Sequence, residues 1–155
     1  MTTQWEIEPH TLAKHEILRR YLSAWYPILS TYNPRIVYLD GFCGPGRYKG
    51  GEDGSPIIAL REALKYSQRL KNNEITFLFV DERADRIAHL NAELNNCIYS
   101  RGNGQRESGF ADQALNSVKS IYAFDGRSIN HRSQSSISIG APLRTKTAGN
   151  FAVDN

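Results

Sequence analysis

The segment from Arg35 to Gly46, RIVYLDGFCGPG, constrains the fold of this chain more than any other. Four apolar residues, Ile36 to Leu39, end in the carboxylate of Asp40, and three glycines follow within six residues. Such an apolar run is typical of a strand buried in a parallel sheet, and glycine lets the backbone bend sharply and approach a ligand. Ligands of open α/β sheets bind just outside the carboxyl ends of the strands. The segment therefore predicts a strand at 35–40 and a ligand-binding turn after it.

Residues 11–29 have the apolar spacing of an amphipathic helix. The apolar positions that recur three or four residues apart are Leu18, Leu22, Trp25 and Leu29. We expect Thr11 to cap this helix, with Pro9 just outside its start. Pro27 lacks a backbone N–H, so we expect it to kink the helix or end it near Tyr26.

After the turn, the sequence repeats the order helix, strand, helix. Ser55 and Pro56 form a helix start, with serine as the predicted cap and proline at the first helical position. A second apolar strand at 75–80 ends in Asp81 and Glu82. The helix predicted next carries its apolar face on Ile87, Leu90 and Leu94. This order predicts an α/β fold, a partial Rossmann-like (methyltransferase-like) parallel sheet with an added N-terminal helix.

The second half of the chain has a different composition from the first. Residues 98–155 are rich in Ser, Gly, Asn and Arg, and only residues 121–124 resemble a buried strand. We therefore divide the chain into an incomplete α/β domain at 1–125 and a polar tail at 126–155 that is predicted to be disordered. Since a sheet of two or three strands is marginal alone, the first half predicts a fold that the second half does not complete.

Composition excludes several classes of function. A net charge of +3 is too small, and too evenly spread, to indicate nucleic-acid binding. The cysteines, Cys43 and Cys97, have neither metal nor disulfide spacing, and no His, Asp or Glu cluster suggests a metal site. The first ten residues do not resemble a signal peptide, and the longest apolar runs are too short to cross a bilayer. We expect a soluble, cytoplasmic protein that does not bind membranes.

Four stretches resemble the beginning of the three-Cys-motif partner protein (TcmP) family: HTLAKHEILRRYLSAWYPIL, YLDGFCGPGRYKGG, GSPIIALREAL and FLFVDE. The resemblance is carried by a Lys-His pair before the Trp helix, the Asp-Gly-Phe-x-Gly-Pro-Gly-Arg-Tyr turn and the Gly-Ser-Pro helix start. It covers roughly residues 8–97. A later Phe-x-Asp-Pro-Phe-Gly pattern of the family is matched only weakly by residues 122–126, so we expect the region after Asn96 to be truncated or read in a shifted frame.

Members of that family are similar to S-adenosylmethionine-dependent methyltransferases, and their genes accompany those of a cysteine-motif protein. The resemblance therefore implies S-adenosylmethionine as the cofactor and a three-Cys-motif protein as the partner. It does not identify a methyl acceptor. The acceptor pocket of such folds comes from later strands, so we do not expect this chain to turn over.

The glycine turn is the first predicted part of a cofactor site. The residues assigned to it are Asp40, Gly41, Phe42, Gly44 and Gly46. The glycines would let the main chain pass beside the methionine part of the cofactor, where backbone N–H groups hold a carboxylate and Asp40 holds the ammonium. The alternative is a tight structural turn in which Asp40 serves only as a turn cap.

The acids after the second strand are the second part of the predicted site. In nucleotide-binding βαβ units an acid at this place accepts hydrogen bonds from the ribose hydroxyls, which favours Asp81 for that role. Glu82 replaces it if the register slips by one residue. The alternative for Asp81 is an acid that caps the next helix.

Five polar residues near the turn are candidates for a lid or for substrate binding: Lys14, His15, Arg47, Tyr48 and Lys49. Those of the loop could orient an anionic substrate, and those of the first helix could cover the cofactor; the alternative for both groups is a solvated surface. Neither a P-loop nor the G-x-G-x-x-G run of NAD enzymes is present. A second hypothesis of another class is a non-catalytic interaction module, with Tyr21, Leu22 and Trp25 as its docking face.

Overall fold

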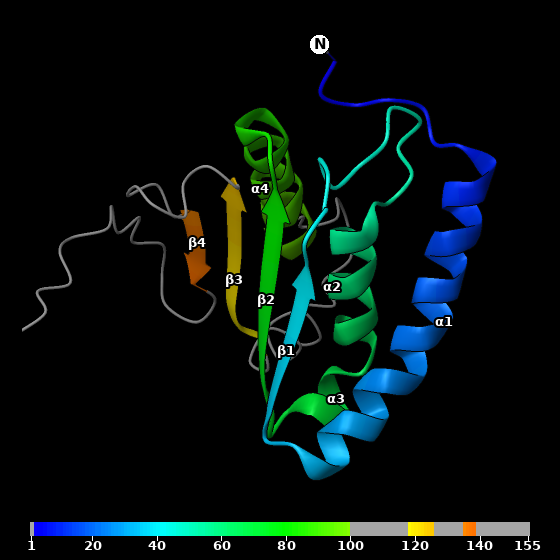
Figure 1. The fold of residues 1–155 in the computed structure, drawn as a ribbon. Coiled ribbons are helices and arrows are strands. Elements are labelled where there is room, and N and C mark those ends of the chain that lie inside the picture. Colours follow the sequence, from blue (N-terminus) through cyan, green and yellow to red (C-terminus); the bar gives the residue numbers. More distant parts are fainter. Residues whose placement is uncertain (1, 100–117, 126–134, 139–155) are drawn as a thin grey trace, which may run out of the picture.

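The computed structural model describes residues 2–99, 118–125 and 135–138. Its elements are α1 (Pro9–Tyr32), β1 (Arg35–Asp40), α2 (Ser55–Lys65), α3 (Ser67–Leu70), β2 (Glu74–Asp81), α4 (Ala84–Tyr99), β3 (Val118–Asp125) and β4 (Ser135–Ser138). The strands form one sheet in the order β1-β2-β3-β4; the first three are parallel and β4 is antiparallel to β3 (Figure 1). The prediction of a mixed α/β fold with a parallel sheet is confirmed.

The core lies between the sheet and the helices that cover one of its faces. Along β2 every second side chain is buried, and Ile75, Phe77 and Phe79 are fully so. Leu60 of α2 and Leu90 of α4 belong to the same buried cluster, so both helices pack on this face; in Figure 1, α4 lies behind β2 and α2 lies beside β1. The alternating burial of β2 places Asp81, at its end, on the covered face as well.

The opposite face of the sheet is covered by no described helix. Val37 and Leu39 of β1 project from this face and are 57% and 64% exposed, whereas Ile36 on the covered face is 3% exposed. Within the described residues β1 pairs only with β2, so it is an edge strand. Parallel sheets are normally buried on both faces, whereas the described residues cover only one face of this sheet and leave β1 without a second neighbour.

The bounds of α1 differ from the sequence prediction. Thr11 does not cap the helix; its backbone N–H instead donates to the carbonyl of Glu8, the N-cap residue, and Pro9 lies in the first turn. Pro27 does not end the helix either. The apolar stripe continues beyond it to Leu29, which packs against the core, so tertiary packing outweighs the lost backbone hydrogen bond.

Tyr26 connects α1 to α2, and we expect this contact to stabilise the fold. Its side chain is completely buried, and its hydroxyl donates to the carbonyl of Ala59 at 3.0 Å. We expect Tyr26→Phe to lower the free energy of unfolding by about 1 kcal/mol, because the buried hydrogen bond from the Tyr26 hydroxyl to the Ala59 carbonyl is lost. Urea unfolding measures this. Tyr21→Phe is the matched control, since Tyr21 is 59% exposed, and equal losses in both variants would contradict the assignment.

The polar tail contains one element that the sequence analysis did not predict. Residues 135–138 form β4 at the edge of the sheet, so the expectation of disorder throughout 126–155 is wrong for these four residues. A strand that pairs with β3 obtains backbone hydrogen bonds from it and can be polar. The rest of that tail lies outside the described residues. Within the ranges that the structure describes, no helix combines the length and the apolar character needed to cross a bilayer.

Candidate functional site

A cavity of about 280 Å³ lies at the carboxyl ends of β1 and β2. Its walls come from the N-terminal segment, α1, the glycine turn, the loop after it, and the starts of α2 and α4. The lining residues are Trp5, His15, Phe42, Cys43, Gly44, Pro45, Gly46, Arg47, Tyr48, Gly54, Ser55, Asp81, Glu82 and Arg86. The structure thus brings together two segments that the sequence analysis assigned to one site, the glycine turn and the acids after β2.

Asp40 organises the turn and the start of α2. Its Oδ1 accepts the backbone N–H of Phe42 at 3.2 Å, and its Oδ2 accepts the hydroxyl of Ser55 at 2.5 Å. The predicted cap role of Ser55 is wrong, because Gly54 is the N-cap and the Ser55 hydroxyl binds Asp40 instead. Asp40 is half-buried and, among the described residues, is not part of the cavity lining.

Asp81 holds the glycine turn against the end of β2. It is 4% exposed; its Oδ2 accepts the backbone N–H of Gly44 at 3.1 Å, and its Oδ1 accepts that of Arg83 at 3.0 Å. Arg86 lies 3.4 Å from Oδ2, and the N–H of Cys43 donates to the carbonyl of Val80 at 3.0 Å. The lone pairs of Asp81 are therefore largely used by its own chain, as in the capping alternative.

Glu82, unlike Asp81, has a carboxylate whose oxygens can still accept hydrogen bonds from a ligand. It is exposed and lines the cavity. Within the described part of the chain, no hydrogen bond or ion pair engages its side chain. A carboxylate with free oxygens beside a cavity can accept two hydroxyl groups of a ligand, which Asp81 can do only by losing contacts to its own backbone.

Two glycines of the turn are required by geometry. Gly44 and Gly46 have φ angles of +65° and +83°, in the left-handed region that disfavours other residues. A Cβ on Gly46 would also lie 2.7 Å from Cδ1 of Leu90, so α4 packs directly against the turn. Gly41, by contrast, does not have a positive φ, and a Cβ added to it would meet no atom within 4 Å. The three glycines of the predicted motif therefore have different roles.

Arg47 anchors the loop after the turn. Its guanidinium lies 2.7 Å from Glu93 of α4 and 2.9 Å from Asp53. The hydrogen bond that it donates to Glu93 is the largest of several effects that raise the pKa of Arg47. A guanidinium held by two carboxylates is already neutralised, which leaves it little charge for an anionic substrate.

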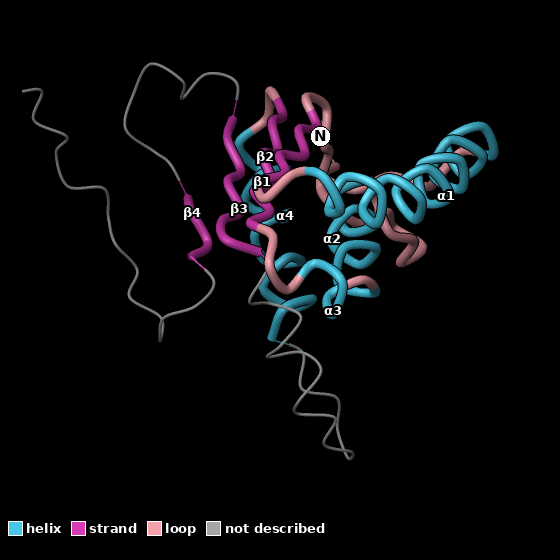
Figure 2. Tube along the Cα trace, turned by 90° about the horizontal axis from the view of Figure 1, so that it is seen from below, coloured by secondary structure: helices cyan, strands magenta, loops and turns pink. Residues whose placement is uncertain are grey.

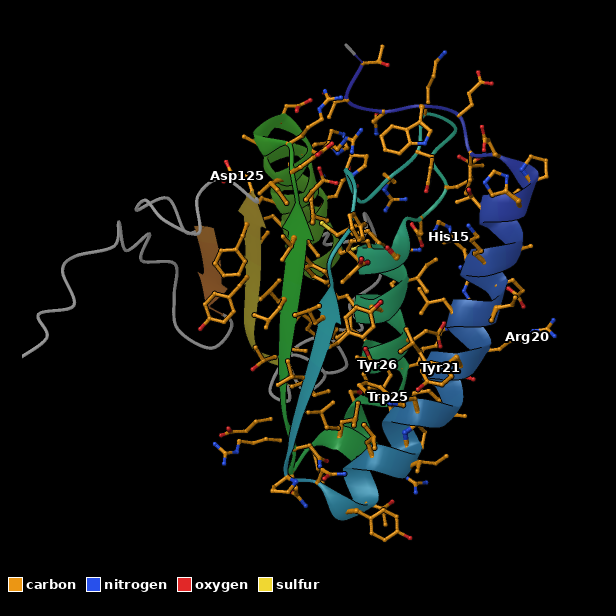
Figure 3. All side chains as sticks on the ribbon, viewed as in Figure 1. His15, Arg20, Tyr21, Trp25, Tyr26 and Asp125 are labelled. Atoms are coloured by element: carbon orange, nitrogen blue, oxygen red, sulfur yellow. The ribbon has the colours of Figure 1, made fainter. Side chains whose placement is uncertain are left out.

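Of the other lid candidates, Tyr48 and His15 reach the cavity, whereas Lys14 and Lys49 are not among its described lining residues. The rings of His15 and Tyr48 are 5.7 Å apart, and His15 lies on the side of α1 that faces α2 (Figure 3). Nδ1 of His15 is buried without a hydrogen-bond partner in the described structure, and burial lowers the pKa of this imidazole. His15 is therefore neutral near pH 7 and available as a hydrogen-bonding group.

Trp5 and Arg86 are cavity residues that the sequence analysis missed. The guanidinium of Arg86 lies 4.8 Å from the centre of the Trp5 ring, and the ring of Tyr48 meets Trp5 edge-on at 5.7 Å. The carbonyl of Trp5 accepts the N–H of Lys49 at 3.0 Å, which ties the N-terminal segment across the loop. A lone tryptophan in a polar N-terminal stretch was the only signal in the sequence.

Cys43 is unsuited to nucleophilic chemistry. Burial, together with the carboxylates of Asp40 and Asp81, raises the pKa of its thiol, and only the thiolate is a strong nucleophile. Both cysteines are free thiols, and the described residues contain no cluster of His, Cys, Asp and Glu suited to a metal ion. The exposed acid in the lining of the cavity is Glu82.

Comparison of the chain with protein family models, with curated proteins and with solved structures found no match.

Proposed function

We propose that the cavity binds S-adenosylmethionine and that the chain is a methyltransferase-like protein that acts with a three-Cys-motif partner. The observation that carries the proposal is the position of the open Glu82 carboxylate and the glycine turn on one cavity, at the carboxyl ends of adjacent parallel strands. This is where open α/β sheets bind nucleotides. The resemblance of residues 8–97 to the TcmP family supports the choice of cofactor and of partner.

Each part of the cavity suits a part of this ligand. Glu82 would accept the two ribose hydroxyls, while Asp81 keeps the turn in place behind it. The positive φ angles of Gly44 and Gly46 let the main chain approach the methionine part without a Cβ between them. The cofactor itself would supply an electrophilic methyl group on its sulfonium. Tyr48 adds aromatic surface to the wall, which favours a planar group of the ligand, whereas the ring of Trp5 already contacts the guanidinium of Arg86.

Substitution of Glu82 tests this assignment. We expect titration calorimetry with S-adenosylmethionine or S-adenosylhomocysteine to show saturable binding, and Glu82→Gln to weaken it about tenfold or more. The reason is that a hydrogen bond to an ionised group is worth about 1.5–3 kcal/mol. Glu16→Gln, an exposed glutamate on α1 outside the cavity lining, is the matched control and should bind like the wild type.

Two results would contradict the proposal: no saturable heat with the wild-type chain, or equal affinity of the Glu82→Gln and wild-type proteins. The first result, combined with a protein that co-purifies, would favour the non-catalytic interaction module. The docking face predicted for that module needs correction. Leu22 is 1% exposed and Trp25 packs against the core, so of the three predicted residues only Tyr21 is open to a partner.

A further inference from the structure

The segment before α1 runs over the cavity. Residues 2–8 belong to no helix or strand, and α1 begins at Pro9. Figure 1 shows the N-terminus at the end of the molecule toward which β1 and β2 point, and Figure 2 shows it beside the sheet rather than beyond α1. The segment therefore passes across the carboxyl ends of the strands, where the cavity lies, on its way to α1.

Trp5 is the residue of this segment that forms part of the cavity wall. The guanidinium of Arg86 lies 4.8 Å from the centre of its ring, and the ring of Tyr48 meets it edge-on at 5.7 Å. A Cβ on Gly44 would lie 3.8 Å from Cη2 of the indole. These three neighbours belong to α4, to the loop and to the glycine turn. Since Trp5 lines the cavity and is 38% exposed, its ring stands between the cavity and the solvent.

The residues beside Trp5 connect the segment to both sides of the cavity. The hydroxyl of Thr3 donates to Oδ2 of Asp85, in the first turn of α4, at 2.8 Å. The side-chain amide of Gln4 donates to the backbone carbonyl of Arg47, in the loop after the glycine turn, at 3.2 Å. The segment thus bridges α4 and the loop, and the cavity lies between these two elements and the sheet.

The bridge is held by few backbone contacts. Among the described residues, one backbone hydrogen bond joins residues 2–7 to the rest of the chain, from the N–H of Lys49 to the carbonyl of Trp5 at 3.0 Å. The ion pair of Glu6 with Lys49, at 3.7 Å, is between exposed side chains, and such pairs contribute little to stability. A segment held in this way opens locally at a much lower free energy than the whole domain unfolds.

We propose that residues 3–6 form a lid that closes the cavity over its ligand, and that Trp5 holds this lid closed. A ligand bound against the glycine turn lies beneath the Trp5 ring, so it enters and leaves only when the lid opens. Opening of a lid often limits the rate of ligand release. The proposal rests on the proposed function only for the choice of S-adenosylhomocysteine as the probe.

Surface plasmon resonance with the immobilised chain and S-adenosylhomocysteine tests the lid. We expect Trp5→Ala to raise the dissociation rate constant about tenfold or more, because the contacts of the indole with Arg86 and Tyr48 are lost. The association rate constant should also rise, since the ligand no longer waits for the lid to open. Trp5→Phe, which keeps a ring over Arg86, should change both rate constants less. Tyr32→Ala is the matched control, an exposed aromatic residue outside the cavity lining, and should bind like the wild type.

Amide hydrogen exchange, followed by nuclear magnetic resonance, tests the lid without a ligand. In Trp5→Ala the N–H of Lys49 should exchange about tenfold faster than in the wild type, because the lid that covers it opens more often. The N–H of Gly51, which donates to the carbonyl of Tyr48 within the same loop, should exchange at an unchanged rate. Circular dichroism confirms that each variant is folded before the comparison.

Three results would overturn the proposal. They are an unchanged exchange rate of Lys49 in folded Trp5→Ala, unchanged rate constants for S-adenosylhomocysteine in that variant, or a rise of the dissociation rate constant alone. The last result would assign Trp5 to a direct contact with the ligand instead of a lid. If the wild-type chain does not bind the compound, the proposed function fails, and the exchange of Lys49 alone decides whether Trp5 holds a lid closed.

Discussion

Asp81→Ala should lower the free energy of unfolding by about 3 kcal/mol, because a buried carboxylate that accepts two backbone N–H groups is lost. The N–H of Gly44 would be left without its acceptor, and Arg86 would lose the carboxylate that lies 3.4 Å from it. The end of β2 would then no longer hold the glycine turn. Urea or thermal unfolding measures the loss directly.

Glu82→Ala is the control for this variant, because it removes the adjacent carboxylate, which is exposed and to which the described structure assigns no hydrogen bond or ion pair. It should change stability by less than about 0.5 kcal/mol, as surface substitutions usually do. We thus expect the two substitutions to affect different measurements: that of Asp81 lowers stability, and that of Glu82 weakens ligand binding. Equal stability of the two variants would show that the contacts of Asp81 do not organise the turn.

Gly46→Ala should cost a similar amount, about 3 kcal/mol, for a different reason. The φ of +83° carries a penalty of roughly 1–2 kcal/mol for a residue with a Cβ. The new methyl group would also lie 2.7 Å from Cδ1 of Leu90, which is completely buried, so the Leu90 side chain, α4 or the turn must shift. Chemical unfolding measures the change in the free energy of unfolding. If the turn shifts and widens the cavity, the affinity for a ligand bound there should also fall.

Gly41→Ala is the matched control on the same turn. Nothing lies within 4 Å of its Cβ position and its φ is not positive, so we expect a change near zero. A small stabilisation is also consistent, since alanine restricts the unfolded chain. If Gly46→Ala were as stable as Gly41→Ala, the close packing of the turn against α4 would be wrong.

Local patterns in the sequence were sufficient to predict β1 and β2 and their parallel order. The apolar runs at 35–40 and 75–80 could be read directly because both are β strands buried on at least one face. Pro27 shows the limit of such local rules. Proline disfavours a helix interior, yet α1 continues through it to Tyr32, because the packing of residues on both sides holds the helix together.

The sequence predicted which segments form the candidate site, but not which role each residue has in it. The sequence places Asp81 and Glu82 side by side without showing which of them turns into the covered face. Only the pleat of β2 and the approach of the glycine turn bury Asp81 and leave Glu82 open. Trp5 could not be assigned from the sequence, because its contacts with Arg86 and Tyr48 join segments that are far apart along the chain.

The sequence alone predicted the order strand, glycine turn, helix, and it predicted that the residues after β1 and β2 come together at one place, where the cavity lies. It could do so because periodicity and glycine content are local properties. The tertiary structure decided which of the two acids is exposed, which arginine is held by carboxylates and which face of α1 packs on the core. These depend on distances between segments remote in sequence, and burial and charge pairing exist only once those segments have packed.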